Sequence, residues 1–425
     1  MTNSFPTPAP TTDDRLASLL KQDAVPMTTL YKRYGPLLEL VRTLIGVIPN
    51  CDQYLEIWPP AFRTYNIMVP NFLNLPFAIF GIGDAPKEIV GLGMYVSSRT
   101  AECTYCSAHT CSFALRRGAS PEKIAQALVG DGKNFTPGEH ATIAVARSLG
   151  RIPCELTEAE RQALRDCFTP VEAEWIVLGI VMMGFLNKFM DAISVELEAS
   201  TVAEVTSTIG AGWSTGKSGR ALDPDKRTAP PTSDSFWTKL SVVRFAPTAL
   251  ILDRKWQQGV PDAWPAVGEF LRQKTGHDFP VLSRMKNARG IQAVASMLRE
   301  NLDPATTVLG LEVKTLAGVI FATVIADEPL AAQVRVLGLK NGASDAQLDA
   351  AAQFALSADS QPTTTDPKMQ AILLLARAAS PSPAAITADI VDVCRQSNLS
   401  SAAIVELITW ISVLQMLHRL SSYFD

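Results

Sequence analysis

The sequence predicts an all-α protein, and three observations support this fold class. Helix-capping patterns are frequent, alternating strand patterns are nearly absent, and the composition is that of a large aliphatic core. Of the 425 residues, 47% are hydrophobic and 19% are charged. A chain of this length suits two domains of roughly 200 residues each better than a single core.

Charge, cysteine content and hydropathy exclude several classes of protein. Lys and Arg number 38 against 42 for Asp and Glu, and no basic run concentrates positive charge, so we expect no nucleic-acid partner. Seven cysteines are too few for a disulfide framework and favour a reducing, cytoplasmic location. The longest purely apolar stretch, residues 175–186, is shorter than the ~20 residues of a membrane span, so we expect no membrane partner.

The helix signals follow one another closely along the first half of the chain. Residues 1–25 carry neither a secretory signal nor a basic transit peptide, and we expect a flexible tail there. Arg116 precedes a glycine and marks a helix end, because cations favour the negative pole of a helix. Thr-x-x-Glu capping boxes at residues 136–139, 157–160 and 169–172 begin three further helices.

A linker is expected over residues 206–235, which are rich in Ser, Thr, Gly and Pro. Residues 211–218 read AGWSTGKS, a loose match to a phosphate-binding loop. A phosphate-binding loop must open a helix, whereas prolines and no apolar stripe follow this stretch. The segment is therefore predicted to connect two domains rather than to bind phosphate.

The two blocks that flank the linker resemble each other. FALRRGAS around Gly118 aligns with VLGLKNGAS around Gly342 at an offset of 224 residues. Further on, the C-terminal parts match at slightly larger offsets, and FLNKFMDAI falls on MLHRLSSYF. We therefore predict one helical domain present twice, over residues 26–205 and 236–425, with the two copies packed as an intramolecular pseudo-dimer.

The sharpest local feature is ECTYCSAHTC, residues 102–111. Cys103 and Cys106 lie one turn apart at a helix start, where the positive pole favours a thiolate. His109 lies closer round the helix to Cys106 than to Cys103, and Thr110 can offer a hydroxyl to either. This pattern predicts a redox-active dithiol, with a buried structural pair as the alternative. Four histidines and no second CxxC disfavour zinc, so we expect no metal.

These residues resemble the AhpD-like alkylhydroperoxidases of the carboxymuconolactone decarboxylase superfamily. Peroxidase-type members carry an acidic residue in one helix, a C-x-[YH]-C dithiol, and one or two histidines directly after it. KEIVGLGMYVSSRTAECTYCSAHTCSFALRRGAS matches that pattern, and FLNKFMDAISVELE resembles the family helix with an Asn-basic pair and an acidic tail. The resemblance covers about residues 60–200. It implies an antioxidant oxidoreductase that needs no cofactor.

The resemblance also implies roles for individual residues. Cys106 corresponds to the thiol that attacks a hydroperoxide and becomes a sulfenic acid, and Cys103 to the thiol that resolves it as a disulfide. His109 corresponds to the nearer of two family histidines. Thr110 and Tyr105 stand where AhpD has further histidines, and we expect them in supporting roles. A lipoyl, thioredoxin-like or small-thiol donor would return the electrons to the dithiol.

The carboxylate of the family's proton relay has two candidates. Glu88 is the first, although it lies fifteen residues before Cys103, and the family spacing of about twelve residues falls on Gly91. Glu102, directly before the dithiol, is the second. Either Glu88 acts on His109 from one turn away, Glu102 takes its place, or the peroxidase activity is weak or repurposed.

Two other functions fit the same residues. The superfamily also contains cofactor-free decarboxylases, lyases and isomerases, so Glu88 and His109 could transfer protons on a carbonyl substrate. The other alternative is a helical scaffold whose dithiol is vestigial.

The second copy has lost the dithiol. The two cysteines fall on Asp327 and Leu330, and the histidine falls on Gln333. We therefore expect residues 236–425 to be catalytically silent and to serve as the packing mate of the first copy. A homo-oligomer could be built on this pseudo-dimer.

Overall fold

The computed structural model describes residues 15–83, 85–127, 134–209, 213–219, 231–357 and 359–425. The predicted all-α class is confirmed, because these residues form helices and short 3-10 turns and no strand. The helices of the N-terminal half are α1 (Leu16–Leu20), α2 (Met27–Ile45), α3 (Cys51–Leu55), α4 (Pro59–Phe72), α5 (Lys87–Thr100), α6 (Thr104–Arg116), α7 (Pro121–Gln126), α8 (Pro137–Gly150), α9 (Glu158–Cys167), α10 (Pro170–Ile193) and α11 (Ala199–Ile209). Those of the C-terminal half are α12 (Phe236–Trp256), α13 (Ala266–Thr275), α14 (Ala288–Asn301), α15 (Leu311–Val324), α16 (Glu328–Lys340), α17 (Asp345–Leu356), α18 (Pro367–Ala379), α19 (Ala388–Gln396) and α20 (Ser401–Phe424).

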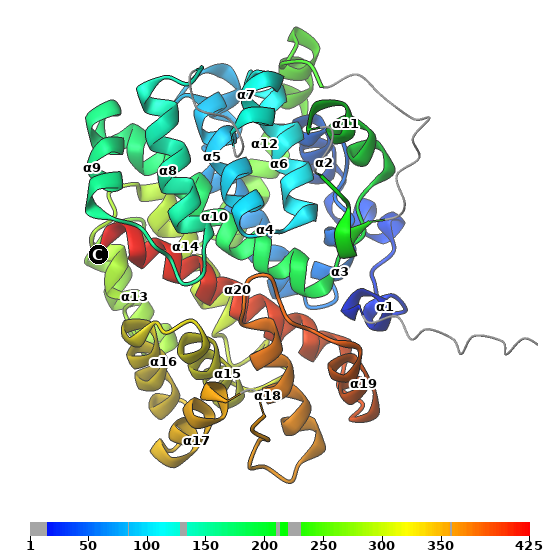
Figure 1. Cartoon of the computed structure of the whole chain (residues 1–425), viewed down its shortest axis with the longest axis vertical. Helices are drawn as coiled ribbons and strands as arrows, with labels where there is room; N and C mark the ends of the chain where they lie inside the picture. The colour runs from blue at the N-terminus through cyan, green and yellow to red at the C-terminus, as the bar shows by residue number, and fades with distance from the viewer. Residues whose placement is uncertain (1–14, 84, 128–133, 210–212, 220–230, 358) are drawn as a thin grey trace, which may run out of the picture.

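The order of helices α5–α10 recurs as α15–α20. Helices α5 and α15 begin 224 residues apart, as do α6 and α16, whereas α8 and α18 begin 230 apart and α10 and α20 begin 231 apart. These offsets match the internal alignment of the sequence. Helices α5–α9 gather in the upper half of Figure 1 and α15–α19 in the lower half. We refer to residues 26–205 as the first repeat and to residues 236–425 as the second.

Helices α10 and α20 pack on each other through the middle of the molecule (Figure 1). A side chain at Gly184 of α10 would place its Cβ 3.0 Å from the Cα of Met416, so only glycine permits this approach. Gln415 of α20 donates its side-chain amide to the carbonyl of Gly184 at 3.1 Å. Both helices are long and apolar enough to cross a membrane by composition, yet 94% and 89% of their most apolar windows are buried within the protein.

The three predicted capping boxes are confirmed at the starts of α8, α9 and α10. At each start, a Thr hydroxyl accepts the backbone N–H of a Glu three residues later, and the Glu side chain accepts the backbone N–H of the Thr. A cap of this kind contributes about 1 kcal/mol. These caps therefore fix the starting points of the helices that carry the core.

The expectation of a flexible tail over residues 1–25 is wrong for the part that the structure describes. Residues 16–20 form α1, and Leu16 and Leu20 are completely buried against α10 and α19. The two leucines lie one turn apart on a single helix face, so burying them offsets the cost of ordering a short helix. Residues 1–14 lie outside the described part of the chain.

The described residues of the expected linker are packed on the first repeat. Residues 206–209 belong to α11, and residues 213–219 run over the start of α6. Thr104 donates its hydroxyl to the carbonyl of Thr215 at 3.0 Å, and the ammonium of Lys217 lies 2.9 Å from the carboxylate of Asp191. The lysine of the phosphate-loop-like stretch is thus paired with an acid. Residues 210–212 and 220–230 are outside the described ranges.

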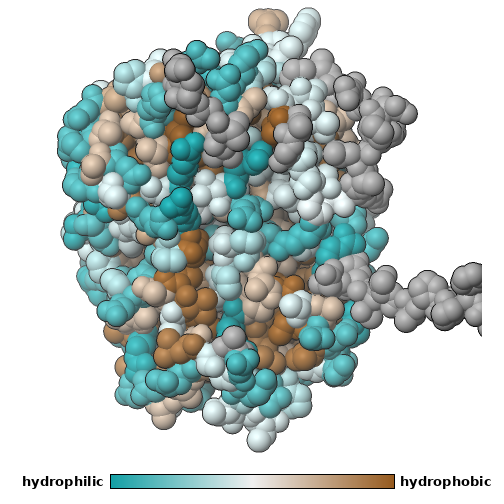
Figure 2. Space-filling view, viewed as in Figure 1, coloured by the Kyte–Doolittle hydropathy of each residue, from teal (hydrophilic) through white to brown (hydrophobic). Residues whose placement is uncertain are grey.

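The surface seen in Figure 2 is largely hydrophilic, and its most hydrophobic patches lie over the lower half, where the second repeat is. Large apolar side chains such as Phe62, Tyr95 and Trp410 are instead buried almost completely. The long central helices and the helices packed around them therefore form one continuous core.

Candidate functional site

The two cysteines of the predicted dithiol lie at the start of α6. Cys103 is the N-cap residue, and its sulfur accepts the backbone N–H of Cys106 at 3.4 Å. The side chains are buried, with exposed fractions of 0% for Cys103 and 3% for Cys106. The sulfur of Cys103 therefore receives a hydrogen bond at the positive pole of the helix, which stabilises negative charge there.

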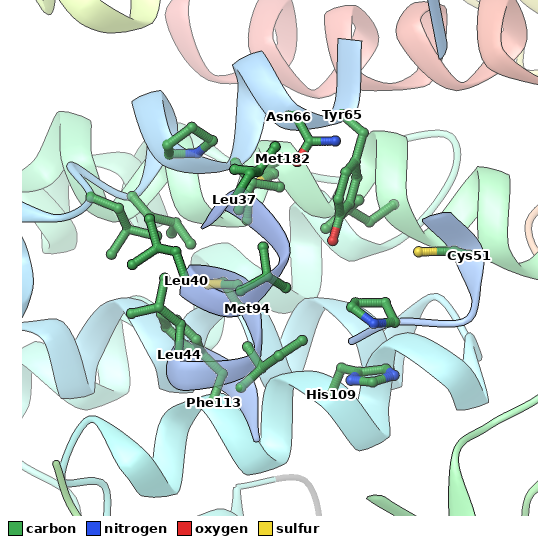
Figure 3. Close-up of a pocket in the computed structure, with 18 of the residues that line it drawn as sticks. Leu37, Leu40, Leu44, Cys51, Tyr65, Asn66, Met94, His109, Phe113 and Met182 are labelled. Carbon is green, nitrogen blue, oxygen red and sulfur yellow. The ribbon is translucent and has the colours of Figure 1, made fainter. Parts of the chain in front are cut away.

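An apolar cavity of about 130 Å³ lies beside this helix start (Figure 3). Cys106 and His109 line it, whereas Cys103 is absent from the lining. A volume of this size is comparable to that of cavities that hold a benzene ring. Its apolar walls come from α2, α4, α5, α6, α10 and α12 and include Leu37, Leu40, Leu44, Met94, Phe113, Met182, Leu250 and Trp256. A compact apolar molecule in this cavity would therefore lie against Cys106 and not against Cys103.

His109 is held by a carboxylate that the sequence reasoning missed. Its Nε2 lies 2.9 Å from Oε2 of Glu198, and the two rings of His109 and Tyr105 are in contact with their centroids 4.5 Å apart. Glu198 also accepts the hydroxyl of Tyr105 at 3.0 Å and the backbone N–H of Asn50 at 2.6 Å. The Nδ1 atom of His109 is buried and has no hydrogen-bond partner among the residues that the structure describes. That nitrogen is free to exchange a proton with a thiol or with a bound molecule.

Opposing effects set the ionisation of the carboxylates around His109. Burial alone would raise the pKa of Glu198, but the charge and hydrogen bond of His109 and the backbone N–H of Asn50 hold it below its ordinary value. Asp52 of α3 is buried as well, and burial followed by the charges of Glu198 and Glu56 raises its pKa to about 8. At neutral pH, Glu198 is therefore the ionised acid and Asp52 the protonated one.

The carboxylates expected from the sequence lie elsewhere. Glu88 is exposed in the first turn of α5, at the end of that helix remote from the dithiol, and lines a shallow surface pocket near Lys123. Glu102 is also exposed, at a left-handed backbone position with φ of 56°. At Gly91, a Cβ would lie 2.8 Å from the Cα of Ala114, so no carboxylate fits there. The structure brings neither expected acid to His109.

The two residues expected in supporting roles, Tyr105 and Thr110, both line the cavity. Tyr105 lies in the site and supports it through its hydrogen bond to Glu198. Thr110 lines the cavity, but its hydroxyl donates to the carbonyl of Cys106 at 2.7 Å, so it is not offered to either thiol. Cys51 of α3, for which no sequence pattern indicated a role, also lines the cavity. Glu198 is the last residue of FLNKFMDAISVELE, whose acidic tail the family resemblance had indicated. Spacing along the sequence, however, does not show that this acid contacts His109.

Burial dominates the acidity of the two thiols in the cavity. The pKa of Cys106 is raised well above its ordinary value, first by burial and then by the hydrogen bond and charge of Cys103. The pKa of Cys51 is likewise raised by burial and by the charge of Asp52. Cys106 is therefore a protonated thiol at neutral pH and needs a base before its sulfur can act as a nucleophile.

The second repeat supplies part of the site. The α12 residues Ala249, Leu250, Asp253 and Trp256 line the cavity wall. In the second repeat itself, the N-cap position of α16 holds Asp327, which accepts the backbone N–H of Leu330 and pairs with His418 at 2.6 Å. A carboxylate thus caps the helix where the first repeat has a thiol.

No cluster of three or more His, Cys, Asp or Glu side chains suited to a metal ion occurs in the described part of the chain. All seven cysteines are free thiols. The residues at the cavity therefore offer thiol and proton-transfer chemistry.

No protein-family model matches the sequence, and no curated protein matches it either. Among the solved structures that are similar over part of the chain are two of the debrominase Bmp8. The crystal structure of the debrominase Bmp8 without ligand shows 22% identity, and that of a single-site variant in complex with 2,3,4-tribromopyrrole shows 21%. Each has a TM-score of 0.36, covering 42% of this chain and 92% of the Bmp8 chain.

Proposed function

We propose that the protein is a thiol-dependent oxidoreductase that reduces a compact apolar hydroperoxide with the Cys103–Cys106 dithiol. The observation that carries this proposal is the placement of the two sulfurs. Cys106 lines the apolar cavity beside His109, and Cys103 lies one turn away outside the lining. An attacking thiol must meet the substrate, whereas a resolving thiol needs only to reach the attacking one.

The reaction proceeds in two steps. Cys106 passes its proton to Nδ1 of His109, and its sulfur attacks the terminal oxygen of the hydroperoxide. The O–O bond breaks, the alkoxide takes a proton from His109 and leaves as an alcohol, and Cys106 becomes a sulfenic acid. The sulfur of Cys103 then attacks that of Cys106, and the hydroxyl group leaves as water with the proton of Cys103. The peroxide has gained the two electrons that the new disulfide has lost.

Glu198 supports the first step through His109. Its carboxylate lies 2.9 Å from Nε2 and stabilises the positive charge that the imidazole carries between taking the proton of Cys106 and giving it to the alkoxide. A dithiol donor then reduces the disulfide by thiol exchange, which restores both cysteines.

The proposal is tested by following the consumption of tert-butyl hydroperoxide with a dithiol donor. We expect Cys106→Ser and Cys103→Ser to lose activity. Cys111→Ser, a buried cysteine on the same helix, and Cys167→Ser, an exposed cysteine on α9, serve as matched controls and should retain it. Equal rates for all five proteins would refute the proposal.

A cofactor-free decarboxylase, lyase or isomerase is the second candidate, because the unpartnered Nδ1 of His109 belongs to an acid–base pair within the cavity wall. This reading predicts that turnover of a carbonyl substrate survives serine at both cysteines and is lost in His109→Ala. The two readings thus differ in which substitution abolishes activity.

A further inference from the structure

An apolar stripe runs along the outer side of α12. Five large apolar side chains of this helix are between 50% and 72% exposed: Phe236, Trp237, Leu240, Val243 and Ile251. At about 100° per residue, four of them lie within about 80° of arc, and Trp237 lies beside them. We call these five residues the α12 stripe. Apolar side chains gathered in this way on a protein surface mark an interaction site.

The α12 stripe is held in place by contacts at the start and on the inner side of the helix. Asp234, two residues before the helix, lies 2.5 Å from the guanidinium of Arg117, and both side chains are buried. The backbone N–H of Asp234 also donates to the carbonyl of Arg116 at 3.0 Å. On the inner side, α12 buries Val242, Ala246 and Ala249. The exposure of the stripe is therefore a property of an ordered helix.

Cations flank the α12 stripe. Lys239, Arg244, Arg254 and Lys255 are all exposed, and none forms an ion pair with a residue that the structure describes. At about 100° per residue, Lys239 lies on one side of the stripe, Arg244 and Lys255 lie on the other, and Arg254 continues its line. The outer side of α12 therefore combines apolar groups with positive charge.

No exposed acid of α12 balances these cations. The only acidic residue of the helix, Asp253, is buried and accepts the side-chain amides of Asn71 and Gln257 at 2.9 Å each. The whole chain, in contrast, has a formal net charge of −4. The positive charge along the stripe is thus a local concentration on an acidic protein, and it calls for a negatively charged partner.

The partner must offer apolar groups and negative charge together. The surface of an anionic phospholipid membrane does so, and helices that lie in membrane interfaces combine Trp, Phe and Leu with flanking Lys and Arg. A second copy of the chain fits less well, because a symmetric pair of α12 helices would bring like charges together. Nucleic acid carries the charge but offers no apolar surface to Leu240, Val243 and Ile251.

We propose that α12 docks the protein on an anionic phospholipid membrane, with the α12 stripe among the lipids of the interface and the four cations against the head groups. The helix lies on the membrane and does not cross it, so docking needs no membrane-spanning stretch. The inner side of α12 lines the cavity through Ala249, Leu250 and Trp256. Docking would therefore bring the cavity within about one helix diameter, ~10 Å, of the lipids.

The proposal is tested by co-sedimenting the full-length protein with vesicles of phosphatidylcholine, alone or mixed with phosphatidylserine. We expect binding to the mixed vesicles to be at least tenfold stronger, because each Lys or Arg near an anionic surface strengthens binding by about fivefold. Raising the ionic strength from about 0.1 M to about 1 M should weaken it, since the screening length falls from about 10 Å to about 3 Å.

Two double variants separate the apolar contribution from the charge. Phe236→Ser with Trp237→Ser removes the aromatic end of the stripe, and Lys239→Gln with Arg254→Gln removes two of its cations. We expect each double variant to bind the mixed vesicles more weakly than the wild type by roughly tenfold or more. All four side chains are exposed, so the fold should survive, and circular dichroism checks this.

Matched controls make the same changes elsewhere on the surface. Val336→Ser with Leu339→Ser alters two apolar residues of α16 that are 43% and 46% exposed. Lys274→Gln with Lys368→Gln removes two exposed cations of α13 and α18. Both controls should bind the mixed vesicles as the wild type does.

Several results would overturn the proposal. They are an absence of vesicle binding, equal binding to both kinds of vesicle, and equal binding by the wild type and the two α12 variants. Binding of single-stranded poly(dT) as strong as that of the mixed vesicles would assign the surface to nucleic acid instead. A dimer in size-exclusion chromatography that dissociates in Phe236→Ser with Trp237→Ser, without vesicle binding, would assign it to a second copy.

The membrane proposal stands independently of the proposed function. If a variant fails to fold, the comparison of the two vesicle types and the effect of salt on the wild type decide the outcome. The vesicle assay involves no peroxide. Vesicle binding without peroxidase activity would therefore refute the proposed function and leave this inference standing.

Discussion

The contact between Glu198 and His109 decides the proton chemistry at the scale of single residues. Glu198→Gln keeps the hydrogen-bonding shape but removes the negative charge beside the imidazole that transfers the proton, so we expect the peroxidase rate to fall by roughly tenfold to a hundredfold. Glu88→Gln is the matched control, because that exposed acid lies away from the cavity. Steady-state rates across a pH series measure both. Equal losses in the two variants would contradict the assignment of Glu198.

Spacing within one helix was sufficient to predict part of the site. Cys103, Cys106 and His109 lie within two turns of α6, so helical geometry alone places them together. Glu198 reaches His109 from beyond the end of α10, and that approach depends on how α10 packs against α6. Glu88 is the kind of residue that a proton relay needs. It lies in the first turn of α5, however, at the end of that helix remote from the dithiol. A local sequence pattern cannot predict tertiary contacts such as the one between Glu198 and His109.

The crossing of α10 and α20 is the critical contact at the scale of secondary-structure elements. A Cβ at Gly184 would meet backbone atoms of α20 at 3.0 Å and 3.1 Å, and backbone cannot move aside as a flexible side chain can. We expect Gly184→Ala to lower the free energy of unfolding by about 1–3 kcal/mol. Urea denaturation measures the change.

Gly35→Ala provides the control for that measurement. A Cβ at Gly35 of α2 would have only ordinary contact, 3.9 Å from a ring carbon of Tyr31. Alanine in a helix reduces the freedom of the unfolded chain, so this variant should be neutral or stabilised by up to about 1 kcal/mol. An equal loss in both variants would show that the α10–α20 crossing has no special need for glycine.

Helix starts were predictable because the signals are local. In each Thr-x-x-Glu box, the Thr and Glu side chains accept backbone N–H groups of the same four residues. Four residues were therefore enough to predict each of the three helix starts. Residues 16–20 were expected to belong to a flexible tail, but they form a helix. The helix is ordered by leucines that pack against α10 and α19, and this tertiary contact has no local sequence pattern. A short helix without a cap has no local signal strong enough to reveal it.

The two repeats depend on each other at the scale of the whole molecule. A fragment of residues 1–205 would expose the face of α10 that packs on α20 and would lack α14, which packs on α4, and α12, which lines the cavity. We expect this fragment to aggregate or self-associate and to lack peroxidase activity. Size-exclusion chromatography and the peroxide assay, run beside the full-length protein, test this. A soluble, monomeric and fully active fragment would show that the second repeat is dispensable.

The cavity wall of α12 belongs to the same polypeptide as Cys106, and this has a consequence for how the protein behaves on dilution. A site assembled from two separate subunits falls apart when the protein concentration drops below their dissociation constant. Here the chain tethers the two repeats, so each finds the other at an effective concentration that dilution cannot change. The cavity is thus as complete in a single isolated molecule as in a concentrated solution.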